Sequence, residues 1–304
     1  ICGQGCGNDC STTKTQACSM PACKTQLQLW SEAAAIQTVT STGGDWHTVT
    51  CPNGKYIVGG GCTSNSAPHI FQQNGPSSNR AWTCGGHGPA KTVWAICSNA
   101  PTVVEEHASG NDWDSFACND PNMQMLGGGC KSAGNAYKFQ ASAPWGNADR
   151  WQCGGHGSGK WTSVICAHKA DIKMDVATYN FGGDWHTVTC ADSMKVIGGG
   201  CIVQPFTDTP NWTNGHGHDC ASYASQWCSG SGFLTGKAWT GGATFNFPEN
   251  NCATCKAEGL YMQASMPASV TVSGSGLAAD QNAWQCGGHG AQKDVYAMCA
   301  HAPL

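Results

Sequence analysis

One five-residue sequence, Cys-Gly-Gly-His-Gly, occurs three times in this chain. The copies span 84–88, 153–157 and 286–290. Each has a tryptophan two residues before its cysteine, and each follows a Gly-Gly-Gly-Cys sequence that ends at Cys62, Cys130 or Cys201. An internal repeat predicts that each copy is one structural unit and that neighbouring units pack on one another. A function proposed for one copy must therefore account for the other two.

The cysteines set the boundaries of the repeat. Each copy holds four of them, and the first follows an Asp-Trp sequence closely. The second and third cysteines have 21 and 22 residues between them in the first two copies but 84 in the third. The sequence therefore predicts a cysteine-rich N-terminal segment (1–35), β module 1 (36–100), β module 2 (101–170) and β module 3 (171–304) with an insertion at 204–258.

Composition indicates the class of protein. The 304 residues include 21 cysteines and 41 glycines, and only 11% are charged, which is typical of secreted, disulfide-stabilised chains. We interpret Ile1-Cys2 as a mature end and expect an extracellular protein. No apolar run approaches the ~18 residues of a transmembrane helix. The net charge of -4 and the scattered basic residues predict no nucleic-acid partner. The sequon at Asn211 predicts a glycosylated surface loop.

The secondary structure expected is short strands. β-Branched and aromatic runs bounded by turn residues occur at 55–58, 92–97 and 295–299, and helical periodicity is nearly absent. A unit of about 65 residues is too small to bury an adequate core alone. We therefore expect an all-β fold, in which three disulfide-stapled antiparallel β modules pack around a pseudo-threefold axis.

Three segments of the first module carry a resemblance. Cys51-x10-Cys62, Cys84-Gly-Gly-His-Gly and the stretch 93–101 together resemble one module of the cysteine- and histidine-rich C-terminal domain of the proprotein convertase that controls the LDL receptor. That domain has three resistin-like modules in quasi-threefold order, and the likeness covers about 36–203 and 259–304. The modules of that family serve as interaction surfaces, so no catalytic motif is implied.

The resemblance also implies nested disulfides in each module. The implied pairs are Cys51–Cys97 around Cys62–Cys84, Cys118–Cys166 around Cys130–Cys153, and Cys190–Cys299 around Cys201–Cys286. A third bridge, present in each module of that family, is missing from this sequence.

The N-terminal segment holds five cysteines between Cys2 and Cys23. The stretch 16–23 resembles the end of a thrombospondin type 1 repeat, although the tryptophan and arginine layers of that family are missing. Because five cysteines cannot pair among themselves, we expect one to reach the rest of the chain or to form an intermolecular disulfide.

Two sets of repeated positions are candidates for a metal site. His87, His156 and His289 share one position; we interpret them as structural residues that satisfy backbone groups in glycine-rich turns, rather than as ligands at the axis. The residue after Asp-Trp is His47, Asp114 or His186, and two histidines with one carboxylate are the ligand set of mononuclear iron sites and of some zinc sites. These three side chains converge only if this position faces the axis. Otherwise they are exposed side chains that flank a buried tryptophan. A metal ion is therefore the one candidate cofactor.

The insertion is the most individual part of the chain. His216 and His218 have the short spacing of metal ligands, but the insertion offers no second group of ligands to complete a site. Four aromatic residues could form a ligand-binding surface or, equally, a small core for the insertion itself. These are Trp212, Tyr223, Trp227 and Trp239. Long ordered insertions are usually functional, so specific function is expected here first.

The function that these observations favour is recognition of an extracellular glycan, small-molecule or protein ligand through the insertion. The alternative is a secreted oxidoreductase of the oxygenase or luciferase kind, which would use the His47, Asp114 and His186 set or the insertion histidines. A structural matrix protein is the third interpretation.

Overall fold

A computed structural model describes most of the chain after the N-terminal segment. The described residues are 36–64, 71–88, 90–132, 139–155, 159–169, 174–182, 185–191, 194–203, 208–229, 233–255, 262, 264–268, 282–287 and 293–301. The expectations for the N-terminal cysteines, for His156 and for His289 lie outside these residues.

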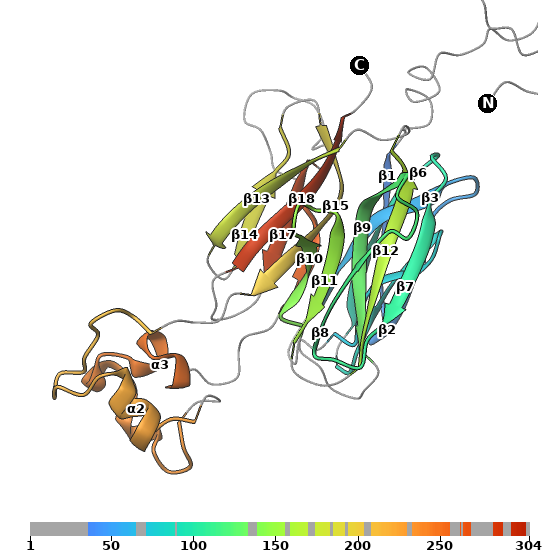
Figure 1. The fold of residues 1–304 in the computed structure, drawn as a ribbon. Coiled ribbons are helices and arrows are strands. Elements are labelled where there is room, and N and C mark those ends of the chain that lie inside the picture. The colour runs from blue at the N-terminus through green and yellow to red at the C-terminus, as the bar shows by residue number, and fades with distance from the viewer. Residues whose placement is uncertain are drawn as a thin grey trace, which may run out of the picture.

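Each module contributes six strands (Figure 1). Module 1 holds β1 (Gln37–Gly43), β2 (Trp46–Thr50), β3 (Tyr56–Ser64), β4 (Gln73–Ser78), β5 (Ala81–Gly85) and β6 (Lys91–Ser98). Module 2 holds β7 (Val103–Ala108), β8 (Trp113–Ala117), β9 (Met123–Ser132), β10 (Ala141–Trp145), β11 (Arg150–Gly154) and β12 (Lys160–His168). Module 3 holds β13 (Met174–Gly182), β14 (Trp185–Thr189), β15 (Met194–Val203), β16 (Ala264–Ala268), β17 (Ala283–Gly287) and β18 (Lys293–His301).

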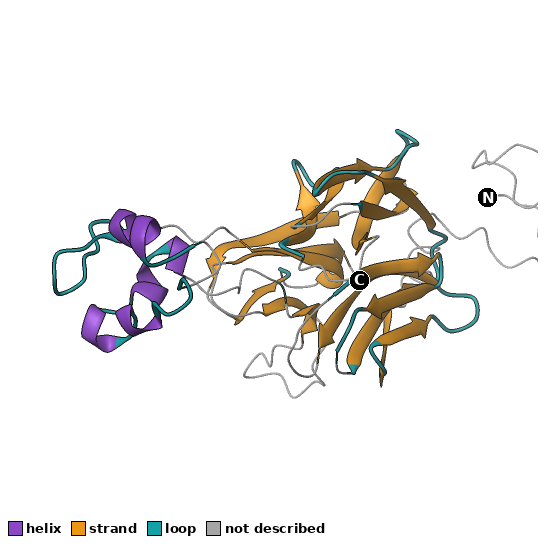
Figure 2. Cartoon of the chain, turned by 90° about the horizontal axis from the view of Figure 1, so that it is seen from below, coloured by secondary structure: helices purple, strands orange, loops and turns teal. Residues whose placement is uncertain are grey.

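The insertion contributes short helices between β15 and β16. They are α2 (Cys220–Gln226), η1 (Ala238–Thr240), η2 (Ala243–Phe245), α3 (Pro248–Asn251) and η3 (Ala253–Cys255). Figures 1 and 2 show these helices standing apart from the strands, at one end of the molecule. Within the described residues, no helix has the length and apolar character needed to cross a membrane.

The strands of the described residues form three six-stranded antiparallel sheets, and each sheet is shared by two modules. Sheet I has the order β1-β6-β3-β16-β17-β14, sheet II the order β2-β5-β4-β9-β12-β7, and sheet III the order β13-β18-β15-β10-β11-β8. The sharing is cyclic, because β9 pairs with β4, β15 with β10 and β3 with β16. The expected all-β fold of three disulfide-stapled modules is therefore present, and the sheets tie the modules into a closed ring.

The first glycine of each Gly-Gly-Gly-Cys sequence lies where the three modules meet. A Cβ atom on Gly59 would collide with the carbonyl oxygen of Ile197, and one on Gly127 would lie 3.0 Å from the carbonyl oxygen of Val58. A Cβ on Gly198 would lie 3.2 Å from the carbonyl oxygen of Leu126, which completes the cycle. The three backbones can approach this closely only where no side chain intervenes. This cycle is the expected pseudo-threefold arrangement.

The second and third glycines have different roles. A Cβ on Gly60 would meet the ring of Trp82, which is 2% exposed and donates from Nε1 to Asn74 Oδ1 over 3.0 Å. A Cβ on Gly61 would meet the backbone of Ser265 in the neighbouring module. The second glycine therefore leaves space for a core tryptophan. The third lets its strand lie close to the backbone of the neighbouring module. Modules 2 and 3 repeat both contacts.

Disulfides connect the sheets to one another. The six nested pairs implied by the resemblance are all formed: Cys51–Cys97, Cys62–Cys84, Cys118–Cys166, Cys130–Cys153, Cys190–Cys299 and Cys201–Cys286. Cys62 is on β3 of sheet I and Cys84 on β5 of sheet II, and the inner pairs of modules 2 and 3 connect sheet II to III and sheet III to I in the same way. The inner disulfide of each module thus links one pair of sheets.

Candidate functional site

The insertion has a hydrophobic core of its own. Two disulfides, Cys220–Cys252 and Cys228–Cys255, surround Tyr223, which is fully buried. The Tyr223 hydroxyl donates to the carbonyl oxygen of Thr240 over 3.0 Å and lies 3.1 Å from Asn214 Nδ2. This core is separate from the core of the β modules. The insertion is therefore a small disulfide-stabilised unit rather than an extended loop.

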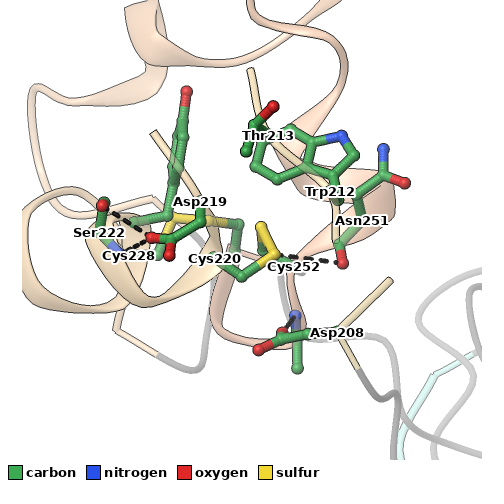
Figure 3. Close-up of a disulfide and its surroundings, with 12 residues drawn as sticks. Asp208, Trp212, Thr213, Asp219, Cys220, Ser222, Cys228, Asn251 and Cys252 are labelled. Atoms are coloured by element: carbon green, nitrogen blue, oxygen red, sulfur yellow. Dashed lines mark hydrogen bonds between the residues drawn. A yellow bond between two sulfur atoms is a disulfide. The ribbon is translucent and has the colours of Figure 1, made fainter. Parts of the chain in front are cut away.

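Aspartates fix the ends of its helical segments, as Figure 3 shows. Asp219 caps α2 and accepts from the Ser222 backbone N–H and from the Ser222 hydroxyl, both over 2.8 Å. These bonds, the backbone bond first, lower the pKa of the Asp219 carboxyl. Asp208 accepts from the backbone N–H of Ala253 over 2.8 Å. The entry and the exit of the insertion are held together in this way.

Asn214 organises the turn that carries the two insertion histidines. Its side chain is buried, and Oδ1 accepts from the backbone N–H groups of His216 and His218, both over 2.9 Å. The two rings then pack on different partners: His216 lies 5.5 Å from the ring of Phe245, and His218 lies 4.9 Å from the ring of Trp227. Among the described residues, no group of three or more His, Cys, Asp or Glu side chains is placed to hold a metal ion.

The insertion carries a row of three aromatic rings, with the half-buried Phe245 between the exposed His216 and Trp239. Trp239 is 64% exposed, and its ring centroid lies 5.9 Å from that of Phe245, which in turn contacts His216. We call His216, Phe245 and Trp239 the aromatic strip. Phe247 and Leu234, in the same unit, are 44% and 40% exposed. Contiguous exposed apolar side chains are typical of interaction sites.

The segment beside the strip has a strained backbone, which hydrogen bonds hold in place. Asn246 and Phe247 have φ angles of 57° and 53°, a left-handed conformation that is rare for a bulky residue. The Asn251 amide donates to the carbonyl oxygens of both residues, over 3.1 and 2.9 Å. Strained backbone that is held by specific contacts is more frequent at binding sites than elsewhere.

The four aromatic residues of the sequence prediction divide between core and surface. Trp212 and Tyr223 are 8% and 0% exposed, and their rings contact each other edge-on at 5.6 Å. This corrects the prediction that they bind a ligand, because the small unit needs them to fill its interior. Trp227 is half-buried against that core, and Trp239 alone of the four is open to solvent. Both sequence alternatives, core and surface, are thus realised by different residues.

The structure places His47, Asp114 and His186 on edge strands of three different sheets. They lie on β2, β8 and β14, each opposite the third cysteine of its module. His47 Nε2 is 3.0 Å from Ser41 Oγ. Asp114 accepts from Thr162 Oγ1 over 2.7 Å and pairs with His107 at 3.1 Å. These contacts of His47 and Asp114 stay within their own modules, and the predicted three-residue metal site is not assembled among the described residues.

The tryptophan of each Asp-Trp sequence is at the surface. Trp46, Trp113 and Trp185 are 47%, 47% and 49% exposed. Each ring covers the first glycine of the Cys-Gly-Gly-His-Gly sequence of its own module. The expectation of a buried tryptophan here is wrong, because the core is already filled by Trp82, Trp151 and Trp284. His87 is exposed in the turn between Gly86 and Gly88, which have φ angles of 145° and 117°.

Sequence reasoning missed three buried lysines. They are Lys91, Lys160 and Lys293, all with 0% exposure. Burial lowers the pKa of Lys91 and of Lys160, and the negative charges of Asp45 and Asp112 oppose that shift. A detectable pattern was present, because each lysine stands six residues before the last cysteine of its module and the aspartate of each Asp-Trp stands six residues before the first.

Asn211 is exposed, in a turn with φ of 58°, so the sequon remains a predicted glycosylation site. Comparison with protein-family models and with curated proteins finds no match for this sequence.

Proposed function

We propose that this chain is a secreted protein that recognises an extracellular ligand through its insertion, and that the ligand is a glycan. The observation that carries the proposal is the exposure of Trp239 at the end of the aromatic strip. A sugar ring has an apolar C–H face that packs on an indole, and its hydroxyls need polar neighbours. Thr213 and Asn246, both exposed, belong to the same unit and offer such groups.

Two further observations support a binding role. Eight disulfides among the described residues are typical of an oxidising, extracellular environment, where such binding takes place. The strip also belongs to a unit with its own core, whose helices stand apart from the sheets (Figure 1). The resemblance to resistin-like interaction modules agrees with this role.

A glycan array probed with the intact, oxidised chain tests the proposal. We expect binding to a restricted set of glycans and its loss in Trp239→Ala. Trp46→Ala removes an exposed tryptophan from module 1 and is the matched control, which should bind normally. If the chain binds no glycan, or if both variants bind like the original, the proposal is wrong.

A further inference from the structure

A cavity of about 700 Å³ lies where module 2 meets module 3. Its apolar lining includes Met123 from the start of β9, Pro144 from β10, Met174 and Val176 from β13, and Tyr296 from β18. Methionine side chains adapt to ligands of varied shape, and a tyrosine ring offers a π face to a cation. The cavity is therefore suited to the apolar part of a small molecule.

The charged residues that line the cavity are mainly acidic. Asp120, Asp149 and Asp175 all line it, against a single lysine, Lys169. The Lys169 ammonium donates to the carbonyl oxygen of Pro121 over 2.7 Å, and the three carboxyl groups outnumber it in the lining. No three acidic groups of the described residues are arranged to hold a metal ion. Carboxylates distributed over an open cavity favour a larger cation instead.

Module 1 shows what distinguishes this cavity. Two residues before its buried tryptophan, module 1 has Arg80, whereas module 2 has Asp149. The Arg80 Nη2 atom donates to the carbonyl oxygens of Cys51 and Pro52, both over 3.0 Å. The arginine side chain therefore occupies the space beside the turn that follows the first cysteine. In module 2 the corresponding turn, which includes Asp120, lines the cavity. The change from arginine to aspartate removes the filling side chain and places a carboxylate there, which also pairs with the exposed side chain of Arg150 at 3.6 Å.

We propose that the cavity between modules 2 and 3 binds an organic cation, an ammonium group carried on an apolar body. The ammonium lies among the carboxylates of Asp120, Asp149 and Asp175, and the apolar body packs on Met123, Met174 and Tyr296. This site is separate from the insertion and does not depend on the glycan proposal.

Three probes of equal chain length separate charge from hydrophobicity: octylamine, octanol and octanoate. In calorimetric titrations of the whole oxidised chain at low salt, octylamine should bind best, octanol more weakly and octanoate not at all. Raising the salt concentration should weaken octylamine binding, because partly exposed charge pairs are screened.

Two substitutions then locate the site. Asp149→Asn should weaken octylamine binding about fivefold, as expected for the loss of one partly exposed charge. Asp149→Arg, which introduces the residue of module 1, should abolish it. The control Asp208→Asn changes an exposed aspartate of the insertion, and its amide oxygen can still accept from Ala253. Equal binding of the three probes, no octylamine binding, or an Asp149→Asn variant that binds like Asp208→Asn would overturn the proposal.

Discussion

Individual glycines determine whether the three modules can meet. Gly59→Ala should lower the free energy of unfolding by about 3 kcal/mol or more, because the new Cβ would collide with the Ile197 carbonyl oxygen in a packed interior. Gly198→Ala should cost less, since its Cβ would lie 3.2 Å from the nearest backbone atom. Denaturant unfolding of the oxidised chain measures both losses.

The matched control for these substitutions is Gly44→Ala. No atom lies within 4 Å of a Cβ at Gly44, and its φ is not positive, so stability should change by less than about 0.5 kcal/mol. If Gly59→Ala is as stable as Gly44→Ala, close backbone approach is not what the first glycine provides.

The buried lysines depend on the aspartate of the Asp-Trp sequence. Asp112→Asn should destabilise the protein by about 1 kcal/mol, because it removes the negative charge that offsets the burial of Lys160. In a Lys160→Met background the same change should have almost no effect. A double-mutant cycle from denaturant unfolding gives the coupling, and additive effects would show that the two charges do not interact.

The lysines also give stability a dependence on pH. Burial places the folded-state pKa of Lys160 below the unfolded value, so the folded chain loses this proton first as the pH rises. The unfolding free energy should therefore increase between the folded-state pKa and about 10.4, and part of the increase should disappear in Lys160→Met. Unfolding measured with free thiols blocked tests this sign.

Local sequence patterns predicted some residues well and others poorly. The resemblance implied the six nested disulfides, because each copy keeps the same order of four cysteines as the modules that it resembles. The sequence did not show which of two tryptophans in each module is buried. Trp82 is in the core and Trp46 is at the surface, and no periodicity distinguishes them. Tertiary packing alone decides which ring fills the core. The cavity beside Asp149 depends on a difference between copies, which the repeat itself conceals.

Among the structural elements, the insertion is held by its own disulfides. Replacing Cys228 and Cys255 together by alanine should destabilise it by roughly 3.5 kcal/mol in the chain-entropy model, for a sequence separation of 27 residues. Because its core is separate from that of the β modules, the three sheets should remain intact. Limited proteolysis should then cut within 208–255 only.

The control removes a disulfide with a similar separation from the sheets. Cys62 and Cys84 are 22 residues apart and connect sheets I and II, so their replacement by alanine should expose β strands to protease and leave the insertion folded. Cleavage of the sheets in the Cys228 and Cys255 variant would show that the insertion and the modules unfold together.

The helices of the insertion could not be predicted from the sequence. α2 has seven residues and α3 four, which is too short for an amphipathic period to be recognised. The side chains that turn inward, Trp212 and Tyr223, are selected by disulfide geometry and by Asn214 rather than by a pattern. The strands were easier, because β-branched runs between glycine turns recur in each copy.

At the scale of the whole molecule, a module is a unit of sequence but not of folding. The sharing of strands between modules was not visible in the sequence, because cross-module pairs involve only a few residues, such as Gln73–Lys131 and Asn74–Cys130. Residues 36–100 alone would leave β3 and β4 as unpaired edges. An isolated module is therefore marginal, and the closed ring supplies the stability.

The ring should, in contrast, tolerate loss of the insertion. In module 1 the segment 65–70 connects the third strand to Phe71, and 204–261 occupies the same place before Met262 in module 3. Replacing 204–261 by the sequence of 65–70 should leave β15 and β16 in their sheets, since the backbone of Gly61 and its partner Ser265 is untouched. The shortened chain should unfold cooperatively within a few degrees of the original in calorimetry and should lose glycan binding while it retains octylamine binding. A chain that no longer folds would mean that the insertion is part of the ring, and the separate roles of the two sites could not stand.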